Sequence, residues 1–343
     1  MRIAVIGAPW VPVPPPAYGG TEAVLADLLP ALAATGHEVA YAGHPDSTVG
    51  VEVLAAIEAA VDSQMGNTAA ELAHVLAAYE DAARWGADLI HDHTLVGPLA
   101  GSAVVPVVVT SHGPFDALTT PIFERITRRA DVVAISRSQA RSAPSVPITA
   151  VVHHGLDARR WPLGAGGRHL TFLGRMHPHK APDRAIRIAR RAGVPLVLAA
   201  KMREPAEIAY FEECVRPLLH ADACFVGEAD AVAKRELLAG SIALLNPIAW
   251  PEPLGMVMLE ALACGTPVLA SPLGAAPEIV AHGRNGYLCT SDDDFVAAVD
   301  AAGRLDRRAC RATVVERFPV ERMVDGYLEV FGAAVSRRTR TVA

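Results

Sequence analysis

The chain has 343 residues, of which 51% are hydrophobic and 5% aromatic, and its formal net charge is −6. This length allows two domains of ordinary size, while the acidic balance argues against nucleic acid as a partner. The five cysteines include no C-x-x-C pair, which indicates reduced thiols in a cytoplasmic protein. No run of eighteen apolar residues predicts a membrane span, and the start MRIAVIGAP is typical of a strand and not of a signal peptide. Peripheral contact with a membrane stays open.

The first half of the chain alternates short β-branched runs with helical patterns. The runs, bounded by Gly, Pro or Asp, predict buried parallel strands at 2–7, 38–43, 87–93, 105–113, 130–136 and 148–155. A helix is expected over 21–35, with Thr21 as its N-cap and a kink or an early end at Pro30. A second helix is expected over 68–85, after Asn67.

The second half repeats the alternation. Strands are expected at 169–174, 195–200, 223–227, 242–247 and 267–271, and helices near 182–192, 205–219, 230–239 and 254–264. Such alternation predicts parallel sheets with helices on both faces. The loop-like stretch 155–169 separates the halves, so we expect an α/β protein of two doubly wound, Rossmann-like domains, over 1–158 and 159–318. Two such domains facing each other would place a ligand cleft between the carboxyl ends of their strands.

Two glycines, Gly19 and Gly20, precede the first expected helix, and no G-x-G-x-x-G motif follows the first strand. Glycines at a helix start let a backbone approach an anion closely. Taken alone, they fit a flexible loop before the helix better.

Arg175 and Lys180 lie between a strand and a helix, in LGRMHPHKAPDRAI (173–186). Two cations at this place could neutralise a diphosphate. A solvated basic loop is the alternative, but Pro178 and Pro182 stiffen the segment, which a solvated loop does not require.

The stretch WPEPLGMVMLEALACGTPVLAS (250–271) holds two glutamates in different surroundings. Prolines on both sides exclude Glu252 from a helix. Glu260 falls in an expected helix that is apolar all round and therefore buried. A buried carboxylate needs hydrogen-bond donors, which sugar hydroxyls could supply, as could a backbone amide or an arginine.

In combination, GGTE, the loop with Arg175 and Lys180, and PEPLGMVMLEALACGTPV resemble the retaining GT-B-fold enzymes of glycosyltransferase family 4. The resemblance covers nearly the whole chain and is strongest over 169–290. The run HPHKAPDRAI and the short length are similar to the subgroup that contains the avilamycin-pathway glycosyltransferase.

The resemblance implies transfer of a sugar from a nucleoside diphosphate, foremost UDP, to an alcohol acceptor with retained configuration. No cofactor and no metal ion are implied. Among the implied catalytic side chains, Arg175 and Lys180 would bind the diphosphate, Glu252 would contact the donor sugar, and His112 would lie near the reacting carbon. The implied donor-binding residues are Gly19, Gly20, Gly227, Glu228, Leu254, Gly255, Met256 and, on the ribose, Glu260. The helical run 319–335 would pack back on the first domain, as it does in GT-B proteins.

The chain departs from the family pattern at two places. It has Ala181 after Lys180 where the pattern has glycine, and Asn246-Pro247 where the pattern has Pro-Ser. Both changes leave the identity of the donor sugar open. The alanine-rich and arginine-rich composition indicates a high-GC bacterium, which favours an acceptor from antibiotic, oligosaccharide or glycoconjugate biosynthesis.

Other function classes make different demands on these residues. A nucleotide-sugar epimerase or hydrolase shares the GT-B fold, and a non-catalytic sugar-nucleotide binder would not need the full charged set. A dinucleotide-dependent oxidoreductase would carry G-x-G-x-x-G after the first strand. The histidines at 91, 93, 153, 154, 177 and 179 fit no standard ligand spacing, so no metal site is expected.

Overall fold

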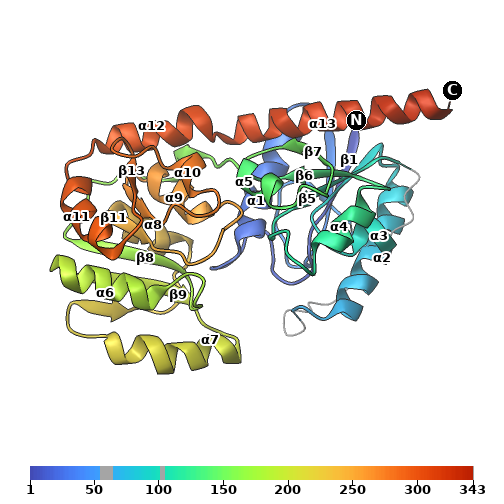
Figure 1. Ribbon diagram of the computed structural model, residues 1–343. Helices are drawn as coiled ribbons and strands as arrows, with labels where there is room; N and C mark the ends of the chain where they lie inside the picture. Colours follow the sequence, from blue (N-terminus) through green and yellow to red (C-terminus); the bar gives the residue numbers. More distant parts are fainter. Residues whose placement is uncertain (55–64, 101–104, 343) are drawn as a thin grey trace. The chain divides into compact units, whose positions relative to one another are not determined.

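The computed structural model describes residues 1–54, 65–100 and 105–342, which form two compact units (Figure 1). Unit 1 comprises Met1–Pro15, Gly19–Gly155 and the chain from Val320 onward. Unit 2 comprises Pro16–Tyr18 and Leu156–Pro319. No helix in the described part of the chain is long and apolar enough to cross a lipid bilayer.

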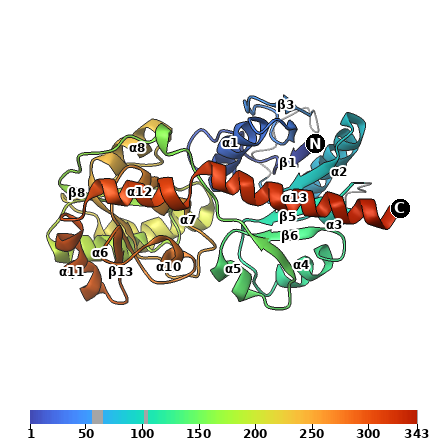
Figure 2. The same cartoon turned by 90° about the horizontal axis from the view of Figure 1, so that it is seen from above.

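Unit 1 is built on a parallel sheet that has seven strands in the described residues, in the order β3-β2-β1-β4-β5-β6-β7. The strands are β1 (Arg2–Ile6), β2 (Glu38–Ala42), β3 (Glu52–Val53), β4 (Leu89–Asp92), β5 (Val107–Ser111), β6 (Asp131–Ala134) and β7 (Ile148–Val151). The helices are α1 (Gly20–Ala33), α2 (Thr68–Trp85), α3 (Gly97–Ala100), α4 (Thr120–Ile126), α5 (Arg137–Ser142) and the long C-terminal α13 (Val320–Val342). Helix α13, red in Figure 2, packs against α1 and β5.

Unit 2 repeats this topology with six parallel strands in its described residues, in the order β10-β9-β8-β11-β12-β13. They are β8 (His169–Arg175), β9 (Leu196–Lys201), β10 (Ala223–Phe225), β11 (Ser241–Asn246), β12 (Val268–Ala270) and β13 (Gly286–Leu288). The helices are α6 (Pro182–Ala192), α7 (Pro205–Tyr210), α8 (Ala231–Ala239), α9 (Met256–Ala263), α10 (Ala276–Ile279), α11 (Asp292–Ala302) and α12 (Arg307–Arg317).

Both strand orders are those of a doubly wound sheet, so the predicted fold class is confirmed. The strands are nearly continuous apolar runs because helices cover both of their faces; the four residues Ile3–Ile6 of β1, for example, are fully buried. Each sheet reverses its order once, between β1 and β4 in unit 1 and between β8 and β11 in unit 2. In open α/β sheets ligands bind at the carboxyl ends of the strands beside this reversal.

Some expected boundaries were wrong. Helix α1 begins at Gly20 with Gly19 as its N-cap, so Thr21 lies inside the helix, and α1 continues past Pro30 to Ala33. The helix expected over 205–219 ends at Tyr210 and is followed by a π-helical turn and a 3₁₀ turn. Pro217 lies in this last turn, and its missing N–H cannot continue an α-helix.

Candidate functional site

Three of the predicted site residues belong to the carboxyl ends of the two strands beside the reversal in unit 2. Arg175 ends β8, Lys180 lies in the turn that leads to α6, and Glu252 lies in the loop between β11 and α9. The fold thus places side chains from distant parts of the sequence where open α/β sheets bind ligands.

Lys180 and Glu252 form an ion pair in which Lys180 Nζ donates to Glu252 Oε1. The aliphatic part of Lys180 passes over Gly174, where an added Cβ would lie 3.6 Å from Lys180 Cγ. The second carboxylate oxygen, Glu252 Oε2, is buried and has no hydrogen-bond partner in the described part of the chain. A buried carboxylate oxygen favours a donor, so this atom can accept a hydrogen bond from a ligand.

Glu252 lies against the start of helix α9. Gly255 is the N-cap of this helix at φ +87°, a left-handed conformation that suits glycine. An added Cβ on Gly255 would lie 3.3 Å from Glu252 Oε2 and 2.8 Å from Met258 Cε. The first amides of a helix lack intrahelical acceptors and carry the positive end of its dipole. The amides of Leu254–Met256 at this anion-attracting helix start therefore lie near Glu252 Oε2, which has no donor among the described residues.

The second glutamate of the stretch, Glu260, is buried inside α9 as expected, with an exposed fraction of 6%. Its partner is Lys234 of α8, whose Nζ lies 2.5 Å from Glu260 Oε1. The sequence interpretation required a donor but did not identify this lysine. One oxygen of Glu260 is thus satisfied inside the protein before any ligand binds.

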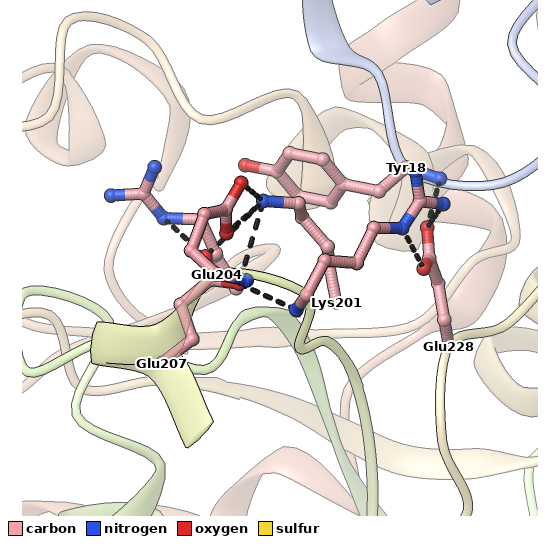
Figure 3. A network of polar contacts seen from close by, with 7 residues as sticks. Tyr18, Lys201, Glu204, Glu207 and Glu228 are labelled. Atoms are coloured by element: carbon pink, nitrogen blue, oxygen red, sulfur yellow. Dashed lines mark hydrogen bonds and ion pairs between the residues drawn. The ribbon is translucent and has the colours of Figure 1, made fainter. Parts of the chain in front are cut away.

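Arg175 pairs with a carboxylate that was not predicted, that of Glu207, which Figure 3 shows near Lys201 and Glu204. Arg175 Nε lies 3.3 Å from Glu207 Oε1, and the Glu207 side chain is only 3% exposed. Glu207 Oε2 accepts from the backbone amide of Arg203 at 2.9 Å, and Lys201 Nζ lies 3.3 Å from Glu207 Oε1. Lys201 also pairs with Glu204. Because β8 and β9 place Arg175 beside Lys201 in register, the two cations share the Glu207 carboxylate.

Gly227 and Glu228 follow β10. Gly227 has φ +84°, and its carbonyl accepts from Ala200 N at 2.9 Å, which fixes the loop against β9. The Glu228 carboxylate receives Arg203 Nη2 at 2.8 Å and the backbone amide of Tyr18 at 2.9 Å. Figure 3 shows Glu228 beside the backbone of Tyr18. These donors already engage the Glu228 side chain.

Both departures from the family pattern lie in unit 2 near the strand reversal. Ala181 adopts φ +54°, the only left-handed residue other than glycine in the described part of the chain. This conformation explains why a glycine would fit there. Asn246 ends β11, and its Nδ2 is buried without a hydrogen-bond partner among the described residues.

The remaining predicted residues belong to unit 1. Gly19 and Gly20 start α1; an added Cβ on Gly19 would lie 2.7 Å from Pro15 Cβ, whereas one on Gly20 would meet nothing within 4 Å. His112 directly follows β5, and both of its ring nitrogens have histidine partners, His93 and His154. Burial lowers the pKa of His112 to about 4, so its imidazole is neutral at pH 7.

Sequence reasoning missed the charged residues that support this site. The segment KMREPAE (201–207) carried a signal, since it places two cations and two carboxylates directly after a buried strand. Nothing in the sequence singled out Lys234, because lysines are common on exposed helix faces. Only the packing of α8 on α9 brings it to Glu260.

Two protein-family models each match one half of the chain. The family model described as Glycosyltransferase Family 4 matches residues 18–160, and the model Glycosyl transferases group 1 matches residues 167–305. A glycogen synthase of Mycobacterium tuberculosis is 27% identical, over 97% of this chain and 95% of that protein.

Among solved structures, AviGT4, a glycosyltransferase involved in avilamycin A biosynthesis, has a TM-score of 0.74 at 23% identity over 98% of both chains. Anabaena HepE in complex with UDP and glucose has a TM-score of 0.75 at 20% identity, over 97% of this chain and 100% of that one.

Proposed function

The chain belongs to glycosyltransferase family 4, whose members are retaining GT-B enzymes that use nucleoside-diphosphate sugars. We propose that it transfers the sugar of a UDP-sugar to an alcohol. Membership in this family excludes the oxidoreductase alternative. The observation that carries the proposal is the pair of Lys180 and Glu252 at the start of α9, with no donor to Glu252 Oε2 among the residues that the structure describes.

We assign the diphosphate to the positive side of this site. Lys180, Arg175 and the amides at the start of α9 would neutralise the charge that grows on the leaving UDP. Preorganised groups of this kind usually supply the largest part of catalysis when the leaving group is an anion. Glu252 Oε2 would accept from a hydroxyl of the donor sugar, which gives the unpaired oxygen a partner.

The transfer breaks the bond between the anomeric carbon and the β-phosphate oxygen and forms one from the same carbon to the acceptor oxygen. Configuration is retained when the acceptor attacks on the face that the diphosphate leaves. We assign the acceptor proton to the departing phosphate oxygen. No protein group takes this proton in the scheme, because Glu252 is already paired with Lys180.

The nucleoside would lie near Gly227 and Glu260. Since Arg203 and the Tyr18 amide occupy the Glu228 carboxylate, we assign the base to the backbone of the Gly227 loop and not to the Glu228 side chain. Lys234 donates to one oxygen of Glu260. The carboxylate would accept hydrogen bonds from the ribose hydroxyls at the lone pairs that Lys234 does not occupy. Gly19 and Gly20 would contact the phosphates, and His112 the sugar.

UDP is the favoured nucleotide because the structurally similar HepE is described in complex with UDP and glucose. We propose a hydroxyl of a small molecule, oligosaccharide or glycoconjugate as the acceptor, a reaction that runs in the cytoplasm without a metal ion. The similarity to AviGT4 supports the antibiotic pathway as one setting.

Thermal shifts test the nucleotide assignment. We expect UDP to raise the melting temperature more than GDP, ADP or dTDP, and NAD to leave it unchanged. A shift with NAD alone would overturn the proposed function. With a UDP-sugar that binds, NMR of the anomeric proton in the product should show retained configuration, and excess chelator should leave the rate unchanged.

A further inference from the structure

Four histidines of unit 1 are in contact at the carboxyl ends of its strands. We call them the histidine chain: His91 in β4, His93 just after it, His112 after β5 and His154 after β7. Neighbouring rings lie 4.1 Å, 5.1 Å and 5.0 Å apart between centroids, in that order. His91, His93 and His154 are buried.

The ring nitrogens form one continuous series of hydrogen bonds. His91 Nδ1 lies 3.3 Å from His93 Nε2, and His93 Nδ1 lies 2.7 Å from His112 Nε2. His112 Nδ1 then lies 3.2 Å from His154 Nε2. Every contact joins an Nδ1 to an Nε2, so the proton positions on successive rings depend on one another.

The first ring is anchored by the C-terminal helix. His91 Nε2 lies 2.9 Å from Thr110 Oγ1, and Thr110 Oγ1 donates to the hydroxyl of Tyr327 in α13 at 3.0 Å. The Tyr327 ring also packs on the His91 ring at 4.5 Å between centroids. Because the Thr110 proton points to Tyr327, the Thr110 oxygen must accept from His91, which places the His91 proton on Nε2.

The position of the His91 proton determines which nitrogen carries the proton on each of the other three rings. A neutral imidazole carries one N–H and one bare nitrogen. With its proton on Nε2, His91 presents a bare Nδ1, so His93 must donate from Nε2, and the same condition passes to His112 and His154. Burial lowers the pKa of all four histidines, which keeps the rings neutral.

The far end of the series is His154 Nδ1. This nitrogen is buried and has no hydrogen-bond partner in the described part of unit 1. The direction of the series leaves it bare, so it is an acceptor. A nitrogen without a proton accepts a hydrogen bond from a neutral hydroxyl and repels an oxyanion, which suits a sugar and not a phosphate.

We propose that His154 Nδ1 accepts a hydrogen bond from a hydroxyl of the donor sugar, and that Tyr327 is a positioning residue that sets the proton positions of the whole histidine chain. The assignment of the ligand rests on the proposed function, in which the neighbouring His112 contacts that sugar. The assignment of the proton positions depends on unit 1 alone.

Side-chain ¹⁵N NMR of the free, histidine-labelled protein tests the proton positions. We expect all four rings to carry the proton on Nε2 at pH 7. In Tyr327→Phe the Thr110 proton loses its acceptor and turns to His91 Nε2, so all four rings should change to Nδ1–H. Phe331→Leu is the matched control, since Phe331 packs on both His91 and Tyr327 but has no polar atom. Protons on Nδ1 in the wild type, or unchanged rings in Tyr327→Phe, would overturn the role of Tyr327.

Binding of deoxyfluoro sugars tests the ligand, because fluorine in place of a hydroxyl cannot donate. UDP-hexoses fluorinated singly at positions 2, 3, 4 and 6 are compared in the wild type and in His154→Phe. At one position we expect fluorine to weaken wild-type binding roughly tenfold and to leave His154→Phe binding unchanged. Equal effects of fluorine in both proteins at all four positions would overturn the hydroxyl contact. Failure of UDP itself to bind would instead overturn the proposed function, while the NMR result would stand.

Discussion

Lys180 Nζ donates to Glu252 Oε1, and the two side chains are only 13% and 12% exposed. The family resemblance implies separate roles for them, one on the diphosphate and one on the sugar, but not this contact. Removing either partner leaves the other charge in a largely buried place, which is more unfavourable than the absence of the whole pair. We therefore expect single substitutions at the two positions to lower stability, in addition to the effect on turnover that the proposed function predicts.

We expect Lys180→Ala to lower turnover by roughly 10²–10³-fold, because the leaving diphosphate loses a fixed positive charge. Its melting temperature should fall as well, since Glu252 keeps no cation. In Lys180→Ala with Glu252→Gln, the melting temperature should recover towards the wild type while turnover stays low. Turnover of a UDP-sugar and thermal melting measure the two effects separately.

Arg187→Ala is the control for this comparison, because Arg187 pairs with Asp183 on the partly exposed surface of α6. Such pairs contribute little to stability, so turnover and melting should both stay near the wild type. Turnover at the wild-type level in Lys180→Ala would contradict the assignment of this lysine to the diphosphate.

Glu260 is assigned to the ribose, although Lys234 already pairs with it. We expect the wild type to bind UDP about tenfold more tightly than its 2′-deoxy analogue, since a lost hydrogen bond to a charged group is worth about 1.5–3 kcal/mol. Glu260→Gln should bind both nucleotides with nearly equal affinity in calorimetric titration. Lys234→Met is the matched variant, because it breaks the ion pair but keeps the Glu260 carboxylate. It should still bind UDP more tightly than the 2′-deoxy analogue. If Glu260→Gln still preferred UDP over the 2′-deoxy analogue as strongly as the wild type does, the ribose assignment would be wrong and Glu260 would serve only as the partner of Lys234.

Arg175 shares the Glu207 carboxylate with Lys201. We expect Glu207→Gln to weaken UDP binding, because the Arg175 guanidinium loses the anion that orients it. In the Arg175→Ala background the same substitution should have no further effect, which corresponds to a coupling of about 1 kcal/mol in a double-mutant cycle. Glu204→Gln serves as the control, since Glu204 pairs with Lys201, whereas Glu207 is the ion-pair partner of Arg175 among the described residues. Additive losses in the cycle would show that Glu207 does not act through Arg175.

The buried histidines make stability depend on pH. Burial lowers the pKa of His91 to about 3 and of His112 to about 4, whereas unfolded histidine titrates near 6.5. The unfolded chain therefore binds more protons between about pH 6.5 and 4, and the stability present above pH 6.5 is lost as the pH falls through this window. Each fully coupled histidine changes the free energy of unfolding by about 1.4 kcal/mol per pH unit.

Asp92 opposes this trend, because burial raises its pKa to about 6, so its own contribution decreases as the pH rises from 3.8 to 6. Burial also raises the pKa of Glu22, which acts in the same direction as Asp92. These two carboxyl groups do not offset four histidines, and we expect the melting temperature to fall from pH 7.5 to pH 5. The melting temperature of His91→Phe should be lower than that of the wild type at pH 7.5 but should fall by less between pH 7.5 and pH 5. The melting temperature of the exposed-site variant His282→Gln should change with pH as it does in the wild type. Equal losses in all three proteins would contradict the histidine chain as the source.

Much of the architecture follows from local patterns. The apolar runs bounded by turn residues predicted most of the strands. The helix expected after Asn67 is α2, and the structure adds that the Asn67 side chain caps it by accepting from the amides of Ala69 and Ala70. The helix expected over 254–264 is α9 at Met256–Ala263. Such features depend on a few neighbouring residues, so the sequence contains their physical cause.

By itself, the sequence determined the doubly wound fold class, the burial of Glu260 and the loop position of Glu252. Tertiary structure alone decided which polar side chains meet: Glu252 with Lys180, Glu260 with Lys234, Arg175 with Glu207, and His91 with Tyr327 through Thr110. The hydrogen-bonded residues of this set lie 19 to 217 positions apart along the chain. A periodic pattern specifies which face of an element is buried, but the partner across that face depends on how the elements pack, and no local pattern records that.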